Sequence, residues 1–144
     1  MNQGLLLRQL NLELKTAVQM AYLSGLSGTA SLKERLLKFA GDELGHFADV
    51  VGILEGLGFD ASAWPFQLGL EKDPAKALIM LRANEDTLIH YYEEMLVGDS
   101  GLSGDFREKL RNNLKDEEGH LQEMSRLLED IKGGAWHGRS DTDS

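Results

Sequence analysis

The chain has 144 residues, a formal net charge of −9 and no cysteine. This length suits one ordinary domain, and the acidic balance argues against a nucleic-acid-binding surface, which needs a concentrated basic stripe. Without cysteine there can be no disulfide, iron–sulfur cluster or thiolate zinc site, so oxygen and imidazole groups must hold any metal. The apolar runs are much shorter than the roughly 20 residues of a membrane span, and no basic segment precedes the N-terminal leucines. We therefore expect a cytoplasmic protein without a membrane span.

The first predicted helix ends near Gly25 and turns one face toward a core. The residues of that face follow one another in alternating steps of four and three: Leu6, Leu10, Glu13, Ala17 and Met20. The face is apolar except at its middle, where Glu13 lies. A short loop over residues 24–30 leads into the next helix, so we expect the two helices to be antiparallel neighbours.

The second predicted helix begins at a capping box of Ser31 and Glu34 and ends at Gly58. Its inward face has the same spacing and again becomes polar at its middle: Leu36, Phe39, Glu43, His46, Val50, Ile53 and Leu57. The stretch that follows, residues 58–72, contains Trp64-Pro65-Phe66. It is long enough to run the length of a bundle.

The third predicted helix is capped by Asp73, has Pro74 at its first position and stops at Gly98. Its inward face contains Leu78, Leu81, Glu85, Leu88, Tyr92 and Met95. After a short loop over residues 97–104, a second cap pattern, Asp105 with Glu108, begins the fourth helix. The inward face of that helix contains Phe106, Leu110, Asn113, Glu117, His120, Met124, Leu127 and Ile131.

These elements predict an all-α protein with the ferritin-like topology, an antiparallel four-helix bundle with one long crossover between helices 2 and 3. We expect the bundle to occupy residues 1–132 and residues 133–144 to form a polar, flexible tail. The halves of the chain also repeat. A shift of 74 residues lays Asp42, Glu43 and His46 over Asp116, Glu117 and His120, which would give a site between the halves approximate twofold symmetry.

Two copies of a Glu-x-x-His motif, Glu43 to His46 and Glu117 to His120, carry the main functional signal. A carboxylate and an imidazole three residues apart share a helix face, so each copy can place both groups on one metal ion. With Glu13 and Glu85, four carboxylates occupy inward positions where no lysine or arginine offsets them. Burying ionised carboxylates is costly unless something compensates their charge.

Two divalent cations would balance the four carboxylates, and neutral imidazoles would complete the coordination. This set suits two iron ions, with manganese or zinc as substitutes. We expect one ion on Glu13 and His46, the other on Glu85 and His120, and both on the bridging pair Glu43 and Glu117. The competing interpretation treats the histidines as ordinary core residues. Compared with a metal site, it gives a poorer explanation of why two such motifs occur together with two more inward glutamates.

Four other residues have more ordinary interpretations. His90 lies off the inward face, so we expect it at the surface. Tyr92 is inward, where core packing competes with a hydrogen bond to a ligand or a role in electron transfer. Asp42 and Asp116 are candidates for orienting the imidazoles, although side chains next to a ligand point elsewhere on the helix and could be solvated.

Over residues 5–132 the chain resembles the bacterioferritins, a ferritin-like di-iron carboxylate family. The resemblance rests on the second and fourth helices, with Glu13-Leu14 and the region around Glu85 matching the first and third. The matching segments are Asp42-Glu43-Leu44-Gly45-His46 and Leu114-Lys115-Asp116-Glu117-Glu118-Gly119-His120. The resemblance implies ferroxidase activity, in which dioxygen or peroxide oxidises two ferrous ions and the ferric product is stored as mineral.

Three departures from the family pattern limit this inference. Leu44 occupies the place of the methionine that binds haem in bacterioferritins, which argues against haem. Met20 occupies the place of a usual tyrosine, which puts a radical or electron-relay role there in doubt. The last twelve residues lack the apolar periodicity of the short fifth helix that helps to build a storage shell, so both a dimer and a cage remain open as the homo-oligomer.

We therefore expect a ferroxidase-type oxidoreductase for iron storage or detoxification, with ferrous iron and dioxygen or peroxide as its partners. The alternative is a rubrerythrin-like di-iron oxidase or peroxide reductase without mineral storage. The absence of cysteine removes a built-in rubredoxin-like electron module and weakens that alternative. A non-catalytic interaction module that kept the fold is a third class.

Overall fold

The computed structural model describes residues 3–98 and 102–132, in which four long helices dominate. They are α1 (Gln3–Leu26), α2 (Ala30–Gly56), α3 (Pro74–Val97) and α4 (Gly104–Lys132), with a single 3-10 turn, η1 (Ala61–Ala63), after α2. The predicted all-α class is confirmed. None of these helices, within the described ranges, has the length and apolar character that crossing a membrane requires. The tail predicted over residues 133–144 lies outside the described residues.

Three polar side chains cap the N-termini of α2, α3 and α4 by accepting hydrogen bonds from free backbone N–H groups. The Asp73 carboxylate accepts from Lys76 N with Pro74 directly behind it, as predicted. The other two caps differ from the prediction. Thr29, not Ser31, begins α2 by accepting from Leu32 N, and Ser103 Oγ, not Asp105, accepts from Phe106 N at the start of α4. In both helices the capping hydroxyl lies two residues before the predicted cap and accepts from the N–H of the residue three positions after its own. Each helix therefore begins about half a turn earlier than predicted.

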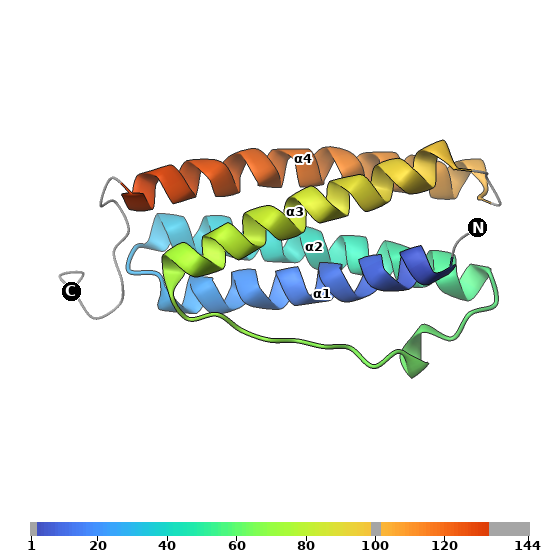
Figure 1. The fold of residues 1–144 in the computed structure, drawn as a ribbon, viewed down its shortest axis with the longest axis horizontal. Helices are drawn as coiled ribbons and strands as arrows, with labels where there is room; N and C mark the ends of the chain where they lie inside the picture. Colours follow the sequence, from blue (N-terminus) through green and yellow to red (C-terminus); the bar gives the residue numbers. More distant parts are fainter. Residues whose placement is uncertain (1–2, 99–101, 133–144) are drawn as a thin grey trace.

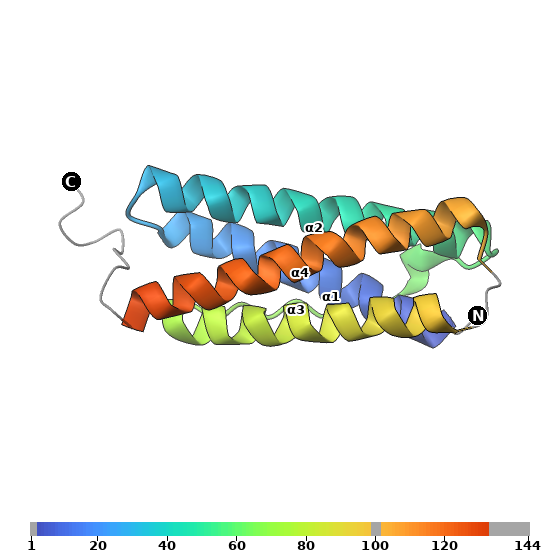
Figure 2. The ribbon, with the colours of Figure 1, turned by 90° about the horizontal axis from the view of Figure 1, so that it is seen from above.

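The four helices pack as two antiparallel hairpins, α1 with α2 and α3 with α4 (Figures 1 and 2). After α2 the chain turns at Gly58, whose positive φ of 84° suits a residue without a side chain. Residues 57–73 then return along the outside of the bundle to the start of α3 (Figure 1). This single long connection is the crossover predicted for the ferritin-like topology, and that prediction is confirmed.

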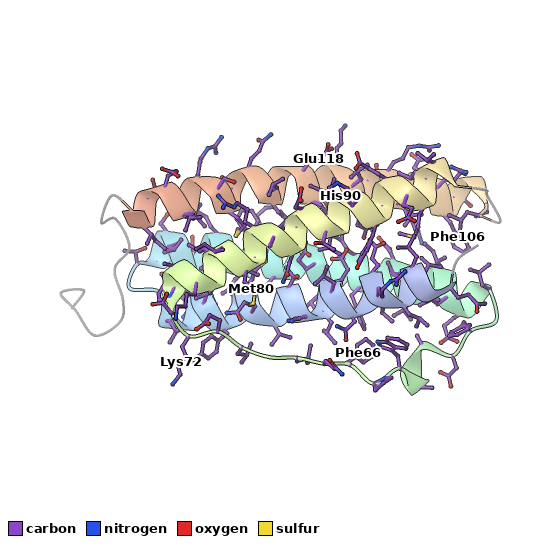
Figure 3. All side chains as sticks on the ribbon, in the orientation of Figure 1. Phe66, Lys72, Met80, His90, Phe106 and Glu118 are labelled. Atoms are coloured by element: carbon purple, nitrogen blue, oxygen red, sulfur yellow. The ribbon has the colours of Figure 1, made fainter. Side chains whose placement is uncertain are left out.

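The crossover is fixed to α1 at two points. Gln67 N donates to Asn11 Oδ1 at 2.9 Å. Further along, Gln19 makes a pair of hydrogen bonds with the backbone of Glu71, at 2.7 and 2.9 Å. Figure 3 shows Phe66 on this segment, and its ring contacts Phe47 of α2 with ring centroids 5.8 Å apart. The crossover is therefore attached to the bundle at several points along its course.

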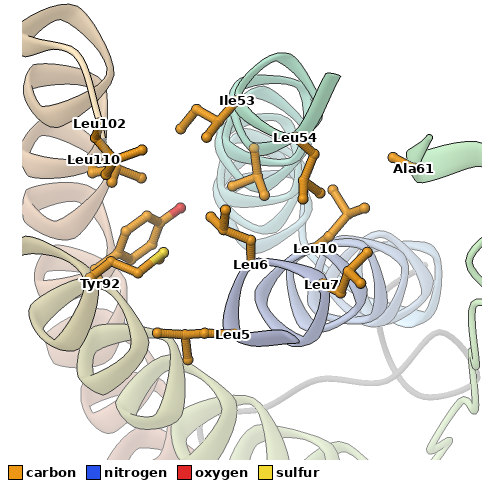
Figure 4. Packing of buried hydrophobic residues seen from close by; sticks show 12 residues of the cluster. Leu5, Leu6, Leu7, Leu10, Ile53, Leu54, Ala61, Tyr92, Leu102 and Leu110 are labelled. Atoms are coloured by element: carbon orange, nitrogen blue, oxygen red, sulfur yellow. The ribbon is translucent and has the colours of Figure 1, made fainter. Parts of the chain in front are cut away.

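Two apolar clusters fill the bundle on either side of its middle. One includes Leu6, Leu10, Ile53, Tyr92 and Leu110, which point toward one another from all four helices (Figure 4). The other includes Met20, Leu36, Leu78, Leu81 and Met124. The inward positions between these clusters are polar, and those polar residues form the site described next.

Candidate metal centre

Six side chains from four helices meet in the layer between the two apolar clusters. Glu13 comes from α1 and Glu85 from α3, while α2 and α4 each supply a glutamate and a histidine one turn apart. All four glutamates are fully buried, and both histidines are 3% exposed. The helical spacing of three or four residues places all of them on inward faces. The structure thus brings all six residues singled out from the sequence into one layer.

Within this layer the ligand-capable atoms form two overlapping groups. One contains Glu13, Glu43, His46 and Glu117, and the other contains Glu43, Glu85, Glu117 and His120. In each group one atom from every residue lies within 4.8 Å of the others. Glu43 and Glu117 belong to both groups. Two ions placed here would share these two carboxylates, and each would have a glutamate and a histidine of its own.

Most of the polar atoms that face the centre have no hydrogen-bond partner among the described residues. They include both oxygens of Glu43, Glu85 and Glu117, one oxygen of Glu13, and the Nδ1 atoms of His46 and His120. His120 Nδ1 lies 2.8 Å from Glu43 Oε1, but without the alignment of a hydrogen bond. Buried polar atoms are rarely left unpaired because each costs free energy. A donor set of carboxylates and imidazoles fits divalent metal ions, which would satisfy all of these atoms together.

Burial makes the charge in this layer unfavourable in the metal-free protein. It raises the pKa of Glu43 and Glu117 well above the usual range, and the charge of Glu13 adds to the effect. The pKa of Glu85 is also raised, again first by burial. The glutamates and histidines of this layer therefore tend to share protons when no metal is present. Cations would replace those protons, which couples metal binding to proton release.

Each histidine is held by the aspartate of the opposite motif. His46 Nε2 lies 2.8 Å from Asp116 Oδ2, and His120 Nε2 lies 3.0 Å from Asp42 Oδ2. With Nε2 bound to an aspartate, Nδ1 of each ring faces the carboxylates. Asp116 and Asp42 are 52% and 30% exposed, so they connect the buried rings to the surface. Such outer carboxylates fix the tautomer and orientation of histidine ligands in metal sites.

The same carboxylates favour protonated imidazoles when metal is absent. Burial by itself lowers the pKa of His46, but the nearby Glu13 carboxylate, with an oxygen 3.6 Å from Nδ1, outweighs it and raises that pKa to about 9. For His120 burial likewise opposes the shift, and Glu43 and Glu85 raise its pKa to about 10. In the metal-free state both imidazoles therefore carry positive charge at neutral pH and partly compensate the glutamates.

The surroundings of the two groups differ. Tyr92 donates its hydroxyl hydrogen to Glu13 Oε1 at 2.7 Å, and Asn113 Nδ2 donates to the Tyr92 oxygen at 3.3 Å. Burial raises the pKa of Tyr92 well above its ordinary value, and the charge of Glu13 adds to the effect, so the phenol keeps the proton that it donates. On the other side, the Phe39 ring packs on the His120 ring, with centroids 4.9 Å apart. Each histidine therefore has an aromatic ring beside it, Tyr92 for His46 and Phe39 for His120, but only the Tyr92 ring has a polar group that reaches a candidate ligand.

The structure decides several points that the sequence left open. Asp42 and Asp116 are not idle surface groups, because each binds a histidine across the bundle. Tyr92 combines core packing with a hydrogen bond to Glu13. His90 is exposed, as expected. Asn113 was given no role from the sequence, although its signal was present as the only amide among the predicted inward residues, one turn before Glu117.

The fold of this chain also occurs among solved structures. It matches a protein described as a dodecameric thioferritin, the bacterioferritin-related protein from Bacteroides fragilis. The match has a TM-score of 0.65 and 19% sequence identity, and it covers 92% of this chain and 89% of the other. No protein-family model matches the sequence, and no curated protein matches it. The similarity establishes the ferritin-like fold.

Proposed function

We propose that this protein is a ferroxidase that binds two ferrous ions between its four helices and promotes their oxidation by dioxygen or peroxide. The observation that carries the proposal is the pair of overlapping ligand groups that share Glu43 and Glu117. A shared pair of carboxylates holds two ions close together, as a two-electron oxidation requires. The ferritin-like fold and the bacterioferritin-related neighbour support iron as the metal.

In the proposed reaction each ferrous ion loses one electron. The two electrons and two protons convert dioxygen to hydrogen peroxide, or hydrogen peroxide to two molecules of water. The glutamates bind and neutralise the ions, while the apolar clusters on both sides keep bulk water out of the layer. The Asp–His pairs keep each Nδ1 directed at the centre, and the Tyr92 hydroxyl fixes one oxygen of Glu13.

Asp116 and, beside its ion pair with Lys38, Asp42 would offer ferrous ions a place to collect near the centre. Both are partly exposed, and each touches a histidine whose other nitrogen faces the buried glutamates. The net charge of −9 would raise the local concentration of cations at such groups. We propose that ferrous ions reach the centre past these aspartates, and that the ferric product serves iron storage or detoxification in the cytoplasm.

The decisive experiment compares ferrous oxidation with and without the bridging carboxylates. Metal-free protein receives two ferrous ions per chain under anaerobic conditions, and the rise of ferric absorbance is followed after addition of air or peroxide. We expect oxidation much faster than in buffer, and loss of this acceleration in Glu43→Ala. A rate equal to that in buffer would contradict the proposal. Rapid consumption of peroxide without retained ferric product would favour the peroxide reductase alternative.

We also propose that the protein is a homo-oligomer that uses the outer face of α2. Leu37 and Leu44 are 46% and 49% exposed there, and Gly41, Gly45 and Ala48 lie around them and are exposed as well. Small residues let a second helix approach closely, and exposed leucines gain free energy when they are covered. The structural neighbour is described as dodecameric, which supports assembly of this chain too.

Light scattering coupled to gel filtration tests this assembly. The variant L37E/L44E should give a smaller species than the unchanged chain. Ile79 of α3 is 50% exposed and lies on another helix, so I79E serves as the control and should leave the size unchanged. A monomeric unchanged chain, or equal sizes for both variants, would overturn the assignment of this face.

A further inference from the structure

A cavity outside the metal centre lies between α1, α3 and the crossover. Its volume is about 500 Å³, within the range of small-molecule sites. Leu12 and Asn84 line it, and they directly precede Glu13 and Glu85 in the sequence. The cavity therefore lies at the same level of the bundle as the metal centre, on the outer side of α1 and α3. None of the six candidate ligands lines it.

The charged groups that line this cavity are both basic. Arg8 and Lys15 lie seven residues apart on one face of α1, and no carboxylate is among the lining residues. Neither side chain forms an ion pair within residues 3–98 and 102–132. The chain as a whole has 24 acidic and 15 basic residues, so a cavity with two free cations and no acid is a local reversal of its charge. Such a lining favours an anion.

Aromatic rings and neutral polar groups make up much of the remaining wall. Trp64 from the crossover and Tyr91 from α3 supply ring surfaces, while Asn11, Gln67 and Thr87 supply hydrogen-bonding groups. Trp64 and Pro65 of the Trp64-Pro65-Phe66 segment line this cavity, whereas Phe66 packs against Phe47. Flat aromatic surfaces favour planar aromatic ligands, with which they can stack.

The wall formed by the crossover is fixed before any ligand binds. Asn11 accepts a hydrogen bond from Gln67 N, and Gln19 binds the Glu71 backbone further along. On the opposite wall Asn84 donates to the buried Thr16 hydroxyl at 3.3 Å. A site that is already ordered loses less conformational entropy on binding. The segment that encloses the cavity is thus held in place by hydrogen bonds to α1.

From the volume, the charge and the aromatic lining, we propose that this cavity binds a small planar aromatic anion. The anionic group would lie between Arg8 and Lys15, and the ring would pack against Trp64 and Tyr91. The site is separate from the metal centre and does not depend on the proposed ferroxidase activity. Its test therefore uses metal-free protein.

The probes are 2-naphthoate and its uncharged counterpart 2-naphthamide, which share one ring system and differ in charge. In W136F, Trp64 is the only tryptophan, so its indole N–H signal in a nitrogen-15 NMR spectrum reports on this cavity alone. We expect saturable shifts of that signal with 2-naphthoate and binding at least about tenfold weaker with 2-naphthamide. Equal affinity for both probes, or no shift of the Trp64 signal, would overturn the proposal.

Charge variants of the same chain provide the matched comparison. R8Q/K15Q should weaken 2-naphthoate binding about tenfold or more, measured by calorimetry. K109Q/R111Q removes the same two charges from exposed positions of α4 and should leave binding within about twofold. An equal effect of both double variants would show a general charge effect and contradict the site. If R8Q/K15Q fails to fold, the two probes still decide the question on W136F.

Discussion

The two halves of the candidate metal centre are built from equivalent residues but lie in different surroundings. Each half has its own glutamate and histidine and shares Glu43 and Glu117 with the other. On one side, the candidate ligand Glu13 accepts a hydrogen bond from Tyr92, which in turn accepts one from Asn113. On the other side, the candidate ligand His120 packs against the Phe39 ring. The candidate ligands are arranged nearly symmetrically, but the residues that surround them are not.

The sequence repeat shows where this asymmetry originates. Tyr92 follows Glu85 by seven residues, and Met20 follows Glu13 by the same distance. Asn113 precedes Glu117 by four residues, as Phe39 precedes Glu43. In each pair of equivalent positions one residue, Tyr92 or Asn113, can donate a hydrogen bond. Its counterpart, Met20 or Phe39, is apolar. We infer that the two metal positions differ in affinity although their ligands correspond.

Removal of a shared glutamate should have the largest effect, because it affects both halves. We expect Glu43→Ala or Glu117→Ala to lower metal content from two ions per chain to fewer than one and to abolish cooperative loading. Glu13→Ala and Glu85→Ala should each lose one ion. Elemental analysis after loading and desalting measures the content. Glu118→Ala, which changes an exposed neighbour on α4, is the control, and full loading of a bridging variant would refute the shared arrangement.

The free energy of unfolding of the metal-free protein should fall as pH rises, and titrating groups from both halves contribute to this fall. Raised folded-state pKa values of Glu43, Glu85 and Glu117 stabilise the fold below about pH 4.5, and this contribution is lost as pH rises through those values. Raised pKa values of His46 and His120, about 9 and about 10, add stability below about pH 6.5 that is lost by about pH 10.

Urea unfolding with a chelator at several pH values, followed by circular dichroism, measures this dependence. With metal bound, stability should instead increase with pH, because the ligands lose their protons and then bind metal more strongly. A variant with glutamine in place of Glu13, Glu43, Glu85 and Glu117 should lose most of the pH dependence. An unchanged slope in that variant would show that the stability depends on other groups.

Substitution of either outer aspartate should weaken metal binding moderately and to a similar extent in the two halves. Asp116→Asn and Asp42→Asn keep the shape of the side chain but remove the charge that orients His46 and His120. Losses of about 10- to 100-fold in affinity are expected from such outer groups. Competitive titration with a chromogenic chelator measures affinity, and Asp86→Asn at an exposed position of α3 is the control. Wild-type affinity in both variants would rule out the orienting role.

Tyr92→Phe should have the smallest effect, confined to one half. The ring that packs in the core is retained, and only the hydrogen bond to Glu13 is lost. We expect about tenfold weaker binding at the Glu13 position and no change at the Glu85 position. A cobalt titration resolves the two positions if their absorption bands differ. Met20→Leu changes the equivalent residue of the other half and should leave the affinity of both metal positions unchanged. If Tyr92→Phe weakened binding equally at both positions, the inferred difference between the halves would be wrong.

The sequence by itself determined the helices, the crossover and the inward positions of the candidate ligands. Helical periodicity is local, so three- and four-residue steps identify the buried face of each helix without knowledge of its partner. A charged residue on such a face, as at Glu13 and Glu85, is conspicuous because burying it is costly. Exact helix starts were less certain, because Thr29 and Ser31, or Ser103 and Asp105, can each cap a helix and the structure selects one of them.

Only the tertiary structure decided which groups support the ligands. The Asp116–His46 and Asp42–His120 pairs are 70 and 78 residues apart in sequence. The hydrogen bonds of Tyr92 to Glu13 and Asn113 likewise depend on how three helices are rotated and placed. Periodicity assigns a face to a helix, but it does not assign the partner across the bundle. The physical reason is that hydrogen bonds between side chains require atoms within about 3 Å, a condition fixed by the packing of the four helices together.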